Sequence, residues 1–118
     1  MASSPEFCEH VLDLLSPLGP VAAKRMFGGF GLYLDGRMFG LIADDTLYLK
    51  ADGMSAPEFE ANGLSQFRPL VKGKPFPMPY WEAPLDALED GEDLCLWARK
   101  ALDAALRAKA QPKRRRRS

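Results

Sequence analysis

Residues 30–43 of this 118-residue chain read FGLYLDGRMFGLIA, and this stretch decides the fold. At its centre, Asp35-Gly36 separates two apolar runs, which is the strongest short signal for a β-hairpin with a two-residue type I′ turn. Such a turn fixes which residues of the two strands face each other. The expected pairs are Leu34 with Arg37, Leu32 with Phe39, and Phe30 with Leu41. Because side chains alternate along a strand, we expect Phe30, Leu32, Phe39 and Leu41 to share the core face.

A second hairpin follows, returning through Asp44-Asp45 to the strand Leu47–Lys50. The sequence alone does not determine the register of this hairpin. A loop of three residues would pair Leu49 with Leu41, whereas a loop of two residues would pair Tyr48 with it.

Three glycines lie around the start of the first hairpin, at positions 28, 29 and 31. They do not fit the dinucleotide-binding fingerprint, because the position three beyond Gly31 is Leu34. They also lack the following helix whose N-terminus would hold a phosphate. We interpret them as a bend or bulge in the sheet.

Three segments have the caps and apolar spacing of helices: residues 3–18, 55–62 and 91–109. Ser4 and Ser55 are the expected N-caps of the first two. The last helix should bury a stripe made of Leu94, Trp97, Ala98, Ala101, Leu102, Ala105 and Leu106.

Between the second and third helices, residues 66–71 and 75–81 read as a strand pair around Lys72-Gly73-Lys74. Pro75, Pro77 and Pro79 sit at alternate positions, so their missing N–H donors lie along one edge and indicate an edge strand. The same alternation places Phe76, Met78 and Tyr80 on one face, which we expect to point inward.

The elements in order, α-β-β-β-β-α-β-β-α, predict an α+β fold with a mostly antiparallel sheet of five or six strands. Residues 1–110 would form one domain. Residues 111–118 would form a disordered basic tail, because residues 112–118 contain no large apolar side chain.

Composition argues against several functions. The chain is 47% hydrophobic without a run of about 20 apolar residues, so we expect neither export nor membrane spanning. Two cysteines and one histidine provide no disulfide framework and no metal site, which indicates a cytoplasmic protein without a metal or cofactor. Cys8 and His10 would point about 200° apart on one helix, so they cannot form a nucleophile–base pair and we expect no enzymatic activity.

The net charge of zero hides an asymmetry. Lys113 and Arg114 to Arg117 carry five of the sixteen positive charges, so residues 1–112, with eleven basic and sixteen acidic side chains, have a net charge of −5. An acidic body is a poor general surface for phosphate backbones. The basic residues that could contact a partner or a nucleic acid are Arg25, Arg68, Lys72, Lys74, Arg114, Arg115, Arg116 and Arg117.

The block KRMFGGFGLY at residues 24–33 is distinctive, and with residues 35–50, 73–84 and the last helix it resembles the N-terminal domain of the TfoX/Sxy competence regulators. The likeness spans about residues 5–106. It implies the same α+β fold and a role in gene regulation, in which founding members promote expression of DNA-uptake genes together with the cyclic-AMP receptor regulator. Longer members carry a second, helical domain, for which residues 112–118 leave no room, so we expect a stand-alone N-terminal domain.

Two functional hypotheses remain at this level. The first is a regulatory or adaptor domain that acts through protein contacts, with a homodimer as one possibility. The second is a small nucleic-acid-binding protein that uses the basic strand ends and the arginine tail.

Overall fold

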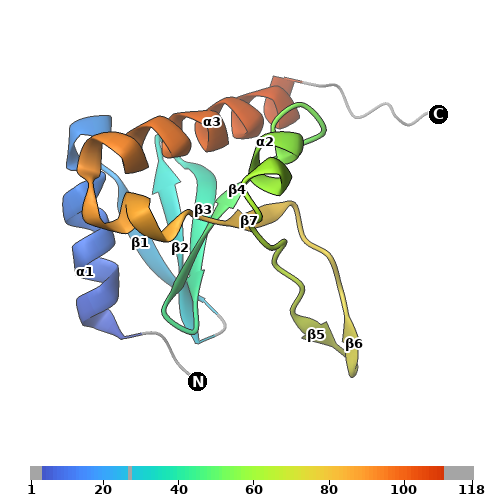
Figure 1. The fold of residues 1–118 in the computed structure, drawn as a ribbon. Helices are drawn as coiled ribbons and strands as arrows, with labels where there is room; N and C mark the ends of the chain where they lie inside the picture. Colours follow the sequence, from blue (N-terminus) through green and yellow to red (C-terminus); the bar gives the residue numbers. More distant parts are fainter. Residues whose placement is uncertain (1–3, 27, 111–118) are drawn as a thin grey trace.

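The computed structural model describes residues 4–26 and 28–110. Five antiparallel strands form the main sheet in the order β1-β2-β3-β4-β7, and α3 crosses one face of it with α1 alongside (Figure 1). The α+β fold expected from the sequence is confirmed. The elements are α1 (Pro5–Leu14), a 3-10 turn (Ser16–Leu18), β1 (Ala22–Met26), β2 (Gly29–Leu34), β3 (Arg37–Ala43), β4 (Thr46–Lys50), α2 (Ala56–Ala61), β5 (Leu70–Val71), β6 (Lys74–Pro75), β7 (Tyr80–Glu82), the 3-10 helix η2 (Leu85–Glu89) and α3 (Gly91–Ala110).

The hairpin between β2 and β3 has the expected type I′ turn. Asp35 and Gly36 both adopt positive φ, 54° and 78°, and Leu34 pairs with Arg37. Beyond Tyr33–Met38, however, a β-bulge shifts the register by one residue. The observed pairs are Leu32 with Gly40, Gly31 with Leu41, and Phe30 with Ile42.

The predicted pairs Leu32–Phe39 and Phe30–Leu41 are therefore wrong. Since the shift exchanges faces, Ile42 takes the core position that we had expected for Leu41. Leu41 lies instead on the opposite face, between Gly31 and Tyr48.

Asp44 and Asp45 make a second two-residue turn with φ of 51° and 54°. Leu41 consequently pairs with Tyr48, which settles the open register in favour of the shorter loop. Leu47 and Leu49 then point into the core.

Gly28 and Gly29 lie where the chain turns from β1 into β2. Gly28 has a φ of 80° in the turn between β1 and β2. Gly29 follows as the first residue of β2, where a Cβ would collide with the carbonyl of Ile42. The close approach of β2 to β3 explains the need for glycine here.

All three helices contribute to one core on the same face of the sheet. Ser4 caps α1 as expected, because its Oγ accepts the Phe7 N–H at 3.2 Å. Phe59 of α2 packs its ring on Trp97 of α3, with centroids 5.0 Å apart. The predicted stripe of α3 is confirmed except at Leu106, which lies in the last two turns of the helix and is 44% exposed.

Residues 66–79, which we call the arm, leave the sheet and project away from the body (Figure 1). The turn is Lys72-Gly73, with φ of 54° and 79°, so Lys74 is paired with Val71 rather than part of the loop as predicted. The N–H groups of Phe76 and Met78 bond to Pro69 and Phe67, which confirms that the proline positions face the other edge. Phe76 does not point inward as expected: it is 53% exposed, because the arm has left the core at this point.

Candidate contact surface

The arm combines exposed apolar side chains with unopposed positive charge. Leu70, Val71 and Phe76 are 71%, 48% and 53% exposed. Three predicted contact residues, Arg68, Lys72 and Lys74, are exposed on the same arm. Residues 61–81 contain no acidic side chain, so nothing within the arm neutralises these cations.

The base of the arm is fixed to the sheet. The ring of Phe67 packs on Tyr48 of β4 with centroids 4.6 Å apart, and the Phe67 N–H bonds to the Tyr80 carbonyl at 2.8 Å. The Gln66 side-chain amide donates to the Met78 carbonyl at 2.8 Å and accepts from the Arg68 guanidinium at 3.3 Å. These contacts anchor the base of the arm, and the four prolines of this segment restrict the conformations open to its backbone.

Arg25 does not belong to this surface. It lies on β1, at the end of the sheet opposite to β7, from which the arm extends. Its guanidinium carbon is 5.3 Å from the centre of the Phe30 ring, directly across the strand pair. The structure thus separates Arg25 from Arg68, Lys72 and Lys74, and gives it a cation–π contact within the fold. The predicted contact residues Arg114 to Arg117 lie outside the described residues.

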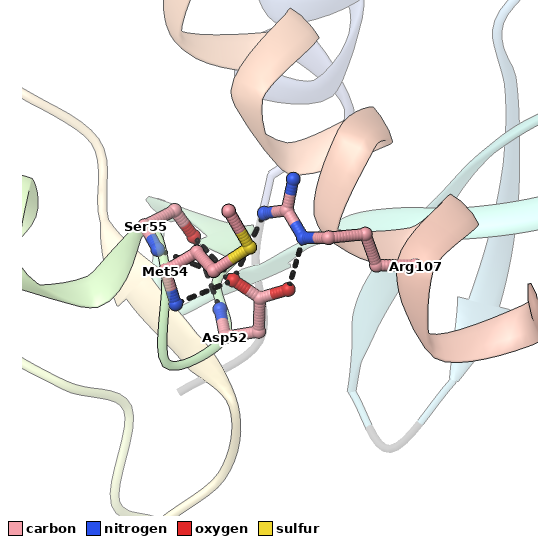
Figure 2. Close-up of polar contacts among 4 residues, drawn as sticks. All are labelled: Asp52, Met54, Ser55 and Arg107. Carbon is pink, nitrogen blue, oxygen red and sulfur yellow. Dashed lines mark hydrogen bonds and ion pairs between the residues drawn. The ribbon is translucent and has the colours of Figure 1, made fainter. Parts of the chain in front are cut away.

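The sequence analysis missed an ion pair that ties the loop after β4 to α3 (Figure 2). Arg107 donates to both oxygens of Asp52, with Nε–Oδ2 at 2.7 Å and Nη2–Oδ1 at 2.9 Å. Oδ1 also accepts the N–H groups of Met54 and Ser55 and the Ser55 hydroxyl. Ser55 is therefore bonded to Asp52 and does not cap α2 through its side chain, as we had expected.

This pair has a structural role. The Arg107 guanidinium and two backbone amides hold the pKa of the Asp52 carboxyl well below its ordinary value. An open cavity of about 450 Å³ adjoins the pair, lined also by Lys50, Met54 and Pro79. The Asp52 oxygens are occupied by five hydrogen bonds from the protein, so the carboxylate is not placed to act on a ligand there. The partners are 55 positions apart in the sequence, which leaves no local signal for the contact.

The reactive side chains singled out in the sequence are engaged elsewhere. Cys8 and Cys95 are buried as free thiols, and burial raises the pKa of Cys8. His10 Nε2 lies 2.8 Å from the Leu88 carbonyl and links α1 to η2. Within residues 4–26 and 28–110, no three His, Cys, Asp or Glu side chains gather as they would around a metal ion. None of the helices in the same ranges has the length and apolarity needed to cross a membrane.

Comparison with known proteins shows the family to which this chain belongs. The sequence profile described as the TfoX N-terminal domain matches residues 13–105, which is most of the chain. The chain therefore belongs to the TfoX N-terminal domain family, as the resemblance had indicated.

Two relatives show what this chain is similar to. The DNA transformation protein TfoX1 of Aliivibrio fischeri is 33% identical over 64 residues, covering 54% of this chain and 31% of TfoX1. The matched part of this chain thus spans about a third of the length of TfoX1. An uncharacterized 12.7 kDa protein in the trpE 5′ region of Spirochaeta aurantia is 30% identical over 118 residues, covering 96% of this chain and 95% of that protein.

Proposed function

We propose that this chain is a non-enzymatic regulatory domain of the competence type, which acts in the cytoplasm through protein contacts. Family membership and the name of the relative TfoX1 support the connection with DNA transformation. The buried thiols and the fully bonded Asp52 carboxylate support a role other than catalysis.

The observation that carries the proposal is the arm. Leu70 and Phe76 expose more than half of their surface on a segment whose base is fixed by Phe67 and Gln66. Exposed apolar side chains on a preformed hairpin lower the cost of binding, because little ordering is needed when a partner arrives. These side chains add nothing to the core, so we assign them to contact with a protein.

A transcript comparison tests this function in the bacterium that carries the gene. One strain lacks the gene, one carries Leu70→Ser with Phe76→Ser, and a control carries Met54→Ser with Leu106→Ser, two exposed apolar residues outside the arm. We expect the arm variant to reproduce the transcript changes of the deletion, while the control matches wild type. Wild-type transcripts in the arm variant would contradict a protein-contact role for the arm, and wild-type transcripts in the deletion would contradict a regulatory function.

Binding of nucleic acid is the second candidate, favoured by Arg68, Lys72 and Lys74 in a segment, residues 61–81, that contains no acidic side chain. Cations on a projecting hairpin can contact phosphates. We rank this function second, because residues 1–112 as a whole have a net charge of −5.

A further inference from the structure

A second surface of the same chain is the electrostatic opposite of the arm. Residues 85–93, which we call the acidic corner, comprise η2 and the beginning of α3. They contain five acidic and no basic residues: Asp86, Glu89, Asp90, Glu92 and Asp93. Leu85, at the start of this corner, is 75% exposed. The corner therefore offers an apolar side chain beside negative charge, as the arm offers apolar side chains beside positive charge.

The charges of both surfaces are available for a partner. The salt bridges between described residues join Lys100 to Glu58 and Arg107 to Asp52, and neither uses the arm or the corner. Within the corner, Asp90 accepts the Glu92 N–H at 3.1 Å and so caps α3. Asp86, Glu89 and Glu92 remain exposed on the surface.

The two surfaces of one molecule cannot meet. The arm extends away from the body beyond β7, whereas η2 lies at the other end of the molecule beside α1 and α3 (Figure 1). The hydrogen bond between His10 and the Leu88 carbonyl holds η2 against α1. An arm can therefore reach an acidic corner only in another molecule.

We propose, building on the protein-contact function above, that the partner of the arm is a second copy of this chain, and that the arm docks on the acidic corner of that copy. In a two-fold arrangement, the arm of each copy binds the acidic corner of the other. This forms a closed dimer with two equivalent contacts. Leu70, Val71 and Phe76 supply the apolar part of each contact, and Lys72 and Lys74 face the carboxylates. Contact is made by side chains, because Pro75, Pro77 and Pro79 remove the donors that strand addition at their edge would need.

Sedimentation equilibrium of the full chain tests this assignment over a range from about 1 µM to about 1 mM. We expect a reversible monomer–dimer equilibrium that salt weakens, because the charges of the contact are exposed. Reversing the arm charges with Lys72→Glu and Lys74→Glu should weaken the dimer by about 10-fold to 100-fold, since each of two symmetric contacts loses attraction and gains repulsion. Reversing the corner with Asp86→Lys and Glu89→Lys should weaken it by a similar factor.

The decisive sample carries all four reversals, because opposite charges then face each other again and the dimer should be restored. A matched control, Glu60→Lys with Asp103→Lys, reverses two exposed acids outside the corner and should dimerise as wild type does. Circular dichroism checks that each variant is folded, and Leu70→Ser provides an arm variant without a charge change, for which we also expect a weaker dimer.

A wild-type chain that stays monomeric throughout this range would overturn the assignment, as would a dimer that is indifferent to the arm and corner reversals. Failure of the fourfold variant to recover the dimer would also contradict it. If Lys72→Glu and Lys74→Glu instead alter only the mobility shift of added DNA, the arm serves nucleic acid. The transcript comparison remains independent: a monomeric chain with arm-dependent transcripts would refute the second copy as partner and leave the protein-contact function standing.

Discussion

The β2–β3 hairpin and the arm are built on nearly the same turn but differ in what their side chains contact. Asp35-Gly36 has φ values of 54° and 78°, and Lys72-Gly73 has 54° and 79°. The first turn joins strands that bury Phe30, Leu32, Phe39 and Ile42, whereas the second joins strands whose apolar side chains remain exposed. Turn geometry thus makes a hairpin in both places, and packing against helices decides whether its apolar side chains are buried in the core or left exposed.

The largest loss of stability should come from a substitution in the core against which the β2–β3 hairpin packs. Trp97 is 9% exposed and packs on Phe59 in the core between the helices and the sheet. Truncating a buried aromatic side chain costs about 3–5 kcal/mol, so Trp97→Ala should leave the domain largely unfolded or aggregated. Thermal denaturation followed by circular dichroism provides the measurement. Melting within about a degree of wild type would mean that α3 is not docked as described.

The two turns themselves provide a matched pair. Gly36→Val and Gly73→Val both place a β-branched residue at positive φ, and neither Cβ would meet another atom, so backbone strain is the only local cost. Gly36→Val should lower the free energy of unfolding by roughly 1–3 kcal/mol. Gly73→Val should lower it by less, because the arm can open locally while the core stays folded. Equal losses in urea denaturation would show that the arm folds as one unit with the sheet.

The ion pair between Asp52 and Arg107 should make a smaller, pH-dependent contribution. Because folding holds the pKa of Asp52 below its unfolded value of about 3.9, the pair stabilises the fold above about pH 4 and loses this effect as the pH falls toward the folded pKa. Asp52→Asn should therefore melt below wild type at pH 7, with a difference that shrinks below pH 4. A difference independent of pH would contradict the assignment.

Removing residues 112–118 should have no effect on the melting temperature, because this segment contains no large apolar side chain. If four or five phosphates engage its basic residues, the log of nucleic-acid affinity should fall with log salt at a slope of roughly −3 to −4.5. An electrophoretic mobility assay across a salt series measures this slope, and the truncated chain should not bind. Sequence-selective binding by the truncated chain at physiological salt would shift attention to Arg68, Lys72 and Lys74.

The sequence predicted the order of the strands better than it predicted which of their side chains face the core. Asp35-Gly36 determined the first hairpin because few other dipeptides suit a type I′ turn. The bulge escaped prediction because Leu41 and Ile42 are adjacent and both apolar, so alternation could not tell which of them faces the core. The α+β class survived this error, since it depends on the order of elements rather than on their register.

The exposed surface of the arm was predicted only in part, for a similar reason. Arg68, Lys72 and Lys74 were identified because their charge is visible in the sequence. Phe76 was expected inside, because an aromatic residue at alternate spacing looks the same in a buried strand and in a hairpin that leaves the body. The contact of Asp52 with Arg107 depends on where the end of α3 passes over the loop, which only the folded chain determines.

Amide hydrogen exchange of the wild-type chain at low and at high protein concentration compares the two hairpins most directly. At low concentration, the amides of Phe76 and Met78 in the arm should exchange faster than those of Leu32 and Leu41 in the sheet, because the arm opens without unfolding the core. At high concentration, exchange in the arm and at the acidic corner should slow, while exchange in the sheet stays unchanged. Arm amides that exchange as slowly as the sheet at every concentration would contradict the view that this hairpin is built for contact rather than for stability.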